Sequence, residues 1–164
     1  MSYQSEERTP DPSWKYDVFL SFQGPDTRRG FISRLYQALK ISGIHAFVDD
    51  DVLRSPEGMS YTMSQAIEAS RVSVVVFSEN YAASRWCLDE VTKIVECGRS
   101  IGQAVIPVFY NVDPADIQNQ RGPYYGEDFQ RHQERSSDER VQAWRAALTE
   151  AANLPGFNIT GKSF

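Results

Sequence analysis

The chain has 164 residues, of which 41% are hydrophobic and 24% are charged, and its formal net charge is -5. These values fit one globular domain and exclude an intrinsically disordered chain. An acidic surface repels phosphate groups on balance, so nucleic acid is an unlikely partner.

Short apolar runs predict the strands of the domain. Residues 1–13 are polar and contain two prolines, so we expect a disordered lead-in before a domain over residues 14–156. Four runs rich in valine, isoleucine and phenylalanine follow, at residues 16–22, 44–48, 72–77 and 104–110. The last two runs are nearly continuous, which is typical of parallel strands buried on both faces. Pro107 cannot donate a ladder hydrogen bond, so its strand should lie near a sheet edge or be locally irregular.

Segments with helical spacing separate these strands. Residues 27–42, 85–98 and 138–152 each place apolar side chains on one face. The three faces consist of Phe31, Leu35, Ala38 and Leu39; of Cys87, Val91, Ile94 and Val95; and of Val141, Trp144, Leu148 and Ala151. Asp26 is a candidate N-cap of the first helix, and Ser136-x-x-Glu139 resembles a capping box before the last one.

This alternation of strands and helices predicts right-handed βαβ units. We therefore expect a flavodoxin-like, doubly wound parallel sheet of four to five strands in the order 2-1-3-4-5, with helices on both faces. Residues 157–164 are either a short edge strand or the start of a linker. Such sheets bind ligands beyond the carboxyl ends of strands one and three, which here points to residues 23–25, 49–61 and 78 onward.

The sequence shows no signal for export, membrane insertion or metal binding. Its first residues lack the apolar core of a signal peptide, and no apolar run approaches the ~20 residues that span a bilayer. Cys87 and Cys97 match no metal-binding spacing, so we interpret them as free thiols in a reducing compartment. His45 lies in a predicted strand, where a core position is expected, and His132 lies in a polar stretch.

Two motifs have simple alternatives to a catalytic role. The acidic residues 49–51 could be a phosphoacceptor site, but a receiver domain also needs an aspartate after strand three, where this chain has Ser78-Glu79. A solvated turn, followed by a polar loop without a helix, is the plain interpretation. Residues 156–163 formally match a phosphate-binding loop, yet a helix precedes them and no helix follows, so we interpret the match as chance.

The start of the helix over residues 85–98 carries the stronger candidate. Trp86 and Glu90 are four residues apart and share a helical face away from the apolar stripe. They could be a surface indole and a solvated acid near a helix N-terminus. Alternatively, they could line a cleft in which the indole stacks on a flat ring and the carboxylate stabilises an oxocarbenium-like charge.

Five segments resemble the boxes of plant TIR domains in order and spacing. They are YDVFLSFQG with Asp26-Thr27-Arg28, SVVVFSENY, SRWCLDE, VIPVFYNVDP and WRAALTEAANL, and they extend from residue 16 to about residue 156. The resemblance implies the N-terminal part of an immune receptor that continues into nucleotide-binding and leucine-rich-repeat regions. It also implies self-association and hydrolysis of NAD⁺ at the nicotinamide–ribose bond, with no cofactor because NAD⁺ is the substrate.

The resemblance also implies roles for individual residues. Glu90 matches the catalytic glutamate, and the other residues implied at the substrate site are Phe22, Gln23, Gly24, Phe47, Asp49, Ser84 and Trp86. Asp49 begins a loop, extending to about Tyr61, that in the family helps close the site of a neighbouring copy. The implied partners are other TIR domains, as homo- or hetero-oligomers, in the cytoplasm or the nucleus, with no membrane association.

Three positions depart from the family pattern, and the first two favour a rival interpretation. Gln23 replaces an arginine suited to phosphate, and Pro25 replaces an acid. Ser33-Arg34 replaces a Ser-His pair at a self-association surface, and two like charges across a two-fold contact are unfavourable without an acid partner. The alternative is therefore a catalytically weak or inactive module that acts only through homotypic or heterotypic TIR–TIR contacts.

Overall fold

The computed structural model describes residues 14–48 and 59–160, which form a five-stranded parallel sheet. The strands are β1 (Tyr16–Ser21), β2 (Ala46–Val48), β3 (Ser70–Phe77), β4 (Ala104–Tyr110) and β5 (Phe157–Ile159). Their order is β2-β1-β3-β4-β5, and all four pairings are parallel. The predicted topology is therefore confirmed, and residues 157–159 form a short edge strand. Pro107 lies in the strand next to this edge, just before the β4–β5 pairing begins at Val108.

Helices of unequal length connect the strands. They are α1 (Gly24–Thr27), the π-helical turn η2 (Arg28–Ile32), α2 (Ser33–Ile41), α3 (Tyr61–Glu68), the 3-10 turn η4 (Tyr81–Ala83), α4 (Arg85–Ser100), α5 (Pro114–Gln118), α6 (Gly122–Arg135) and α7 (Asp138–Ala152). None of the helices in this described part of the chain is long and apolar enough to cross a membrane.

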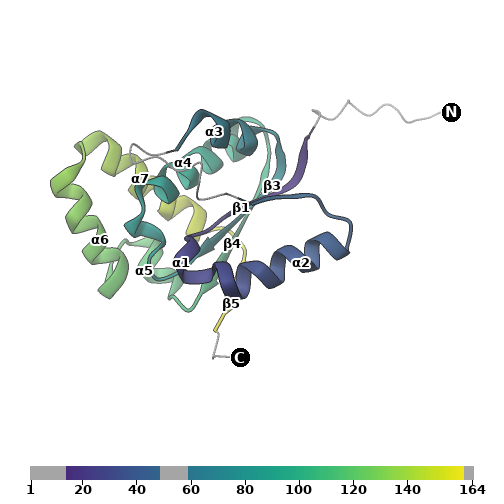
Figure 1. Ribbon diagram of the computed structural model, residues 1–164. Helices are drawn as coiled ribbons and strands as arrows, with labels where there is room; N and C mark the ends of the chain where they lie inside the picture. The colour runs from purple at the N-terminus through teal and green to yellow at the C-terminus, as the bar shows by residue number, and fades with distance from the viewer. Residues whose placement is uncertain (1–13, 49–58, 161–164) are drawn as a thin grey trace.

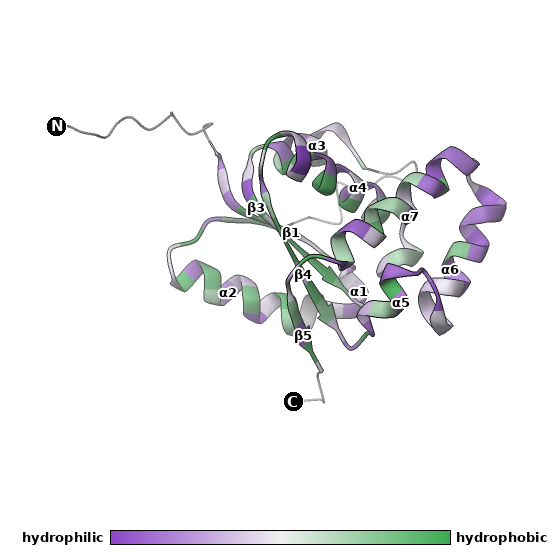
Figure 2. Ribbon diagram, turned by 180° about the vertical axis from the view of Figure 1, so that it is seen from behind, coloured by the Kyte–Doolittle hydropathy of each residue, from purple (hydrophilic) through white to green (hydrophobic). Residues whose placement is uncertain are grey.

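The helices form two layers around the sheet (Figure 1). Helix α2 lies on one face, whereas α3, α4 and α7 lie on the other, and α6 lies outermost beside α7. Figure 2 shows apolar strands in the centre and a mostly polar α6 at the periphery. Burial of apolar side chains between the layers is the main favourable contribution to such a fold.

The larger core cluster lies between the sheet and the layer of α3, α4 and α7. The predicted apolar faces of α4 and α7 are both fully buried in it, which confirms these two predictions. The opposite face of the sheet has a smaller cluster, against which Phe31, Leu35 and Leu39 pack with partial exposure. Ala38 is exposed, so that member of the predicted face of residues 27–42 is wrong.

Several local predictions differ from the structure. The helix expected over residues 27–42 is divided, because a π-helical turn at Arg28–Ile32 precedes the α-helical part. Strand β2 begins only at Ala46, and His45 is exposed with its ring against Tyr16 rather than packed in the core. The N-cap of α7 is Ser137, whose hydroxyl accepts a hydrogen bond from the Arg140 amide, and not Ser136.

Besides the short helices α1 and α5, two longer helices were not predicted from the sequence. Helix α3 begins at Tyr61 with Ser60 as its N-cap, where a helix-free polar loop was the plain interpretation. Helix α6 is polar on most of its surface, but it buries Tyr125, Phe129 and His132 against its neighbours. A helix at the rim of a domain needs only a narrow apolar stripe, so its hydrophobic pattern is weak. The acidic residues 49–51 and residues 161–164 lie outside the described ranges.

His132 gives the fold a specific pH dependence. Its Nε2 donates to the Ala82 carbonyl oxygen at 2.7 Å, and its ring packs on Phe129 and Trp144. Burial lowers the pKa of His132 from 6.5, so the unfolded chain takes up this proton at a higher pH than the folded one. Acidification below about pH 6.5 therefore lowers the free energy of unfolding. Asp128 acts oppositely at lower pH, because burial raises its pKa.

We expect His132→Gln to reduce this pH dependence. The glutamine amide can still donate to Ala82, but it takes up no proton. The measurement is urea unfolding of both proteins at about pH 8 and about pH 6, where carboxylates contribute little to the difference. Equal losses of stability in the two proteins would show that His132 is not responsible.

Candidate functional site

The candidate site lies where β1 and β3 end at the carboxyl edge of the sheet. Strand β1 ends at Ser21 and leads through Phe22 and Gln23 into α1. Strand β3 pairs with β1 in parallel and leads through η4 into α4, which carries Trp86 and Glu90. Because parallel neighbouring strands end at the same edge, this topology brings Ser21 next to the first turns of α4.

Glu90 is the chemically most unusual residue at this edge. Its side chain is 0% exposed, so the interpretation as a solvated surface acid is wrong. The Ser21 hydroxyl donates to Glu90 Oε1 at 2.7 Å, and the Trp86 indole N–H donates to Glu90 Oε2 at 2.5 Å. Burial of a carboxylate is strongly unfavourable unless hydrogen bonds replace its water. The site therefore supplies a donor to each oxygen.

The adjacent acid, Asp89, points to the other side of α4. Its carboxylate accepts hydrogen bonds from Trp144 Nε1 at 2.9 Å and from Arg140 Nη2 at 2.7 Å, both on α7. Successive side chains of a helix point about 100° apart around its axis, so Asp89 and Glu90 face different neighbouring elements. Asp89 therefore joins α4 to α7, and Glu90 faces β1.

Tyr81 completes the polar cluster behind Glu90. Its hydroxyl lies 2.7 Å from Ser21 Oγ and 3.1 Å from the Cys87 carbonyl oxygen. Burial, together with the nearby Cys87 and Glu90, raises the pKa of Tyr81 well above 10.0. Tyr81 is therefore a neutral hydrogen-bonding group near neutral pH and is not a base.

The structure places four of the other predicted residues at the same edge. Phe22 is fully buried, and its carbonyl oxygen lies 3.6 Å from Cys87 Sγ. Gln23 is half-buried and donates weakly, at 3.4 Å, to the Asn80 carbonyl oxygen. Gly24 is buried at the start of α1. Ser84 is half-buried and is the N-cap of α4, where its hydroxyl accepts a hydrogen bond from the Cys87 amide.

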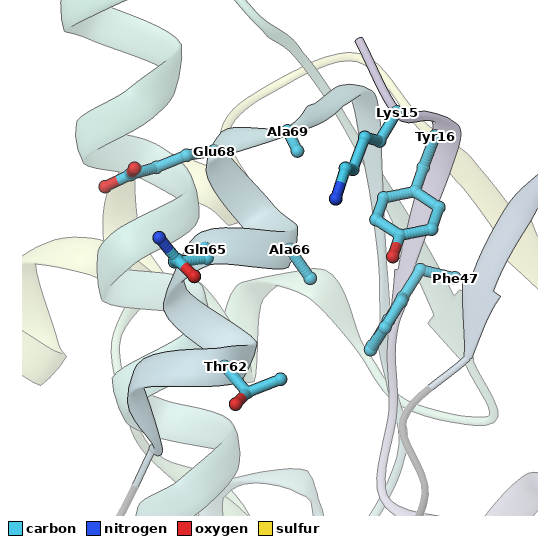
Figure 3. A pocket seen from close by; sticks show the side chains of 8 residues that line it. All are labelled: Lys15, Tyr16, Phe47, Thr62, Gln65, Ala66, Glu68 and Ala69. Carbon is cyan, nitrogen blue, oxygen red and sulfur yellow. The ribbon is translucent and has the colours of Figure 1, made fainter.

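The remaining predicted residues do not join this cluster in the described structure. Phe47 stacks on Phe19 and lines a groove of about 430 Å³ between β1, β2 and α3. Figure 3 shows Tyr16 and Phe47 on one side of this groove and α3 on the other. Asp49 lies outside the described residues, and Ser33 and Arg34 are exposed on α2. The exposure of Ser33 and Arg34 leaves the predicted self-association surface accessible.

Sequence reasoning missed Ser21 and Tyr81. Ser21 is the last residue of a strand otherwise composed largely of apolar side chains, and Tyr81 lies in a short turn before α4. A polar residue at the end of a buried strand is a weak signal that it contacts another buried polar group. The identity of that group depends on side-chain contacts between residues 60 or more positions apart, which no local pattern reveals.

The N-cap role of Ser84 leads to a stability prediction. Loss of an N-cap hydroxyl usually costs about 1 kcal/mol, so Ser84→Ala should lower the free energy of unfolding by about that amount, whereas Ser84→Asp should retain it. Urea unfolding measures both changes. An unchanged stability of Ser84→Ala would indicate that the hydroxyl contributes little to the helix.

The geometry defines what the cluster can do chemically. A carboxylate with a donor on each oxygen, beside an indole, can stabilise a developing positive charge on a sugar carbon or orient a hydroxyl that attacks it. Within the described residues, no group of three or more histidine, cysteine or acidic side chains could hold a metal ion.

Comparisons with known proteins agree with this fold. A family model described as TIR domain matches residues 15–163. Disease resistance protein RPV1 of Vitis rotundifolia is 53% identical over 144 residues, which are 88% of this chain and 10% of that protein. TMV resistance protein N of Nicotiana glutinosa is 49% identical over 145 residues, which are 87% of this chain and 13% of that protein. The chain therefore spans about a tenth of the length of these curated relatives.

A solved structure extends the comparison to three dimensions. The TIR domains in the structure of the activated Roq1 resistosome, which directly recognizes the pathogen effector XopQ, are 44% identical to this chain. The TM-score is 0.79, over 88% of this chain and 87% of that one.

Proposed function

This chain belongs to the TIR domain family, and from that premise we propose that it is a plant immune signalling domain that cleaves NAD⁺ when assembled. The observation that carries the proposal is the buried Glu90 carboxylate, which contacts Trp86 and Ser21 at the ligand-binding edge of the sheet. Buried ionisable groups with specific partners in such positions are candidates for functional sites.

The proposed reaction is hydrolysis of the nicotinamide–ribose bond. The bond from ribose C1′ to the pyridinium nitrogen breaks, and its electron pair goes to the nitrogen, so nicotinamide leaves as a neutral molecule. The positive charge that develops on the ribose is stabilised by the Glu90 carboxylate. A water molecule adds to C1′ and loses a proton, which gives ADP-ribose. Trp86 and Gly24 position the nicotinamide–ribose half of the substrate.

We propose that assembly opens the site. Glu90 is fully buried and Trp86 is 4% exposed, so substrate can reach the carboxylate only after a rearrangement. Assembly through TIR–TIR contacts supplies a second surface against which the rearranged state can be stabilised. The Roq1 relative was solved as an activated resistosome, which supports this direction of reasoning. Arg34 is exposed on α2, so contact between two α2 surfaces requires an acidic partner for each arginine.

A second candidate is a TIR module that only makes contacts with other TIR domains. Two observations favour it. Gln23 is a neutral side chain, which donates to the Asn80 carbonyl oxygen at 3.4 Å, at a position where the family pattern has an arginine suited to phosphate. The carboxylate of Glu90 has its oxygens satisfied inside the domain. Both candidates share the same fold and surface, so they differ only in chemistry.

The deciding experiment is NAD⁺ consumption by the purified protein at high concentration with a crowding agent, with assembly followed by light scattering. The enzyme proposal expects nicotinamide and an ADP-ribose product in equal amounts, at a rate that rises faster than protein concentration. Confirmed assembly with intact NAD⁺ would favour the binding module. In that case Gln23→Arg, which restores the charged fork, is the next protein to assay.

A further inference from the structure

The hydroxyl groups of Ser21 and Tyr81 form a short buried chain that ends on Glu90. Ser21 Oγ lies 2.7 Å from Glu90 Oε1 and 2.7 Å from the Tyr81 hydroxyl, which lies 3.1 Å from the Cys87 carbonyl oxygen. Ser21, Tyr81 and Glu90 are each 0% exposed. The chain therefore links the end of β1, the turn before α4 and the first two turns of α4.

A count of the available protons shows that the hydrogen bonds along these hydroxyl groups can be donated in either of two directions. There are three contacts, but the two hydroxyls supply only two protons. With Glu90 ionised, Tyr81 donates to Ser21, and Ser21 donates to Glu90. With Glu90 protonated, Glu90 donates to Ser21, Ser21 donates to Tyr81, and Tyr81 donates to the Cys87 carbonyl.

In both directions of hydrogen-bond donation, every buried polar group of the Ser21–Tyr81–Glu90 cluster keeps a partner. When Tyr81 turns toward Ser21, the Cys87 carbonyl still has the backbone amide four residues later, because it lies inside α4. When Tyr81 turns toward Cys87, the Ser21 hydroxyl still accepts a proton from Glu90. The two states differ by one proton on Glu90; apart from its gain or loss, only the two hydroxyl hydrogens rotate, and no heavy atom needs to move.

We propose that Ser21 and Tyr81 are positioning residues for Glu90, which hold its carboxyl group in one place whether or not it carries a proton. This inference rests on the proposed function, in which Glu90 faces a changing charge on the ribose. A carboxylate that is held in position needs no reorganisation when that charge develops. Ser21 contacts the carboxyl group of Glu90 directly and Tyr81 contacts it through Ser21, so the role we assign to both hydroxyls is exerted on Glu90 and not on the substrate.

The chain offers matched control variants for the test. Ser73 is 1% exposed in β3, and its hydroxyl has no hydrogen-bond partner among the residues that the structure describes. Ser73→Ala therefore matches Ser21→Ala as a loss of a buried strand hydroxyl. Tyr125 is 1% exposed and donates to the Ser78 carbonyl oxygen at 2.8 Å. Tyr125→Phe thus matches Tyr81→Phe as a loss of a buried tyrosine hydroxyl.

The kinetic test separates kcat from KM under assembled conditions. We expect Ser21→Ala to lower kcat about 10- to 100-fold and Tyr81→Phe to lower it about 3- to 10-fold, because a hydrogen bond to a charged group is the stronger one. KM should stay within about twofold of wild type, as these residues do not bind substrate. Both controls should retain kcat within about twofold. Equal losses in the controls, or a change confined to KM, would overturn the proposal.

A second measurement is independent of catalysis and decides the matter if wild type leaves NAD⁺ intact. We expect Ser21→Ala to lower the urea midpoint of the wild type clearly, but to lower that of a Glu90→Ala protein much less, because its partner is already absent. Ser73→Ala should shift the midpoint equally in both backgrounds. Equal shifts for Ser21→Ala in both backgrounds would refute the positioning role, whereas an inactive wild type with unequal shifts would refute only the proposed function.

Discussion

Glu90→Gln is expected to reduce NAD⁺ cleavage by roughly 10²- to 10⁴-fold, because the substitution removes the one negative charge of the cluster while it retains the shape of the side chain. The present contacts also predict that the variant folds. Its amide oxygen can accept from the Trp86 indole, and its amide nitrogen can donate to Ser21 Oγ, which then donates to Tyr81. Loss of activity should therefore occur without a large loss of stability.

Glu96→Gln is the matched control for this prediction. Glu96 lies on the same helix but is exposed, so the substitution makes the same change of charge away from the site. Nicotinamide release by the three proteins, at equal concentration and equal assembly, is the measurement. If Glu90→Gln retains more than about a tenth of the wild-type rate, its charge is not the source of catalysis.

The sequence predicted the fold well because the strands have a strong local signal. Continuous valine-rich runs and βα alternation indicate buried parallel strands, and the handedness of the connections then leaves few strand orders. The exceptions have physical reasons. A π-helical turn at Arg28–Ile32 preserves the apolar periodicity approximately, so residues 27–42 look like one helix. Helix α6 was not predicted because a polar helix at the rim buries only part of its surface, so its hydrophobic pattern is weak.

The site was predictable only in part. The four-residue spacing of Trp86 and Glu90 indicates that they share a face, but it does not indicate whether that face is buried. Burial depends on β1, which is adjacent in space and distant in sequence. The resemblance to a family directed attention to Glu90, whereas the contact of Ser21 with Glu90 and that of Tyr81 with Ser21 depend on tertiary structure. Positions such as these are visible only in three dimensions.

Trp144→Ala is expected to have the largest effect on stability, with a loss of about 3–5 kcal/mol in the free energy of unfolding. The Trp144 side chain is 1% exposed and fills the space between α4, α6 and α7, where its ring packs on His132 and lies under the Arg140 guanidinium at 5.0 Å. The substitution also removes the indole N–H that donates to Asp89. Because domains of this size are stable by about 5–15 kcal/mol, a substantial unfolded fraction is expected on warming.

Trp144→Phe separates packing from hydrogen bonding at this position. It retains an aromatic ring but leaves Asp89 with Arg140 and without the indole donor, so a loss of about 1–3 kcal/mol is expected. Urea unfolding gives both values, and a loss below about 1 kcal/mol for Trp144→Ala would contradict the packing argument. The activity of these variants should decrease only as the folded fraction decreases, since Asp89 orients α4 and does not face the site. Glu90→Gln should show the opposite pattern, with a stable fold and little activity. Of these two consecutive acids, Asp89 joins α4 to α7, whereas Glu90 faces β1, where we propose that it acts on the substrate.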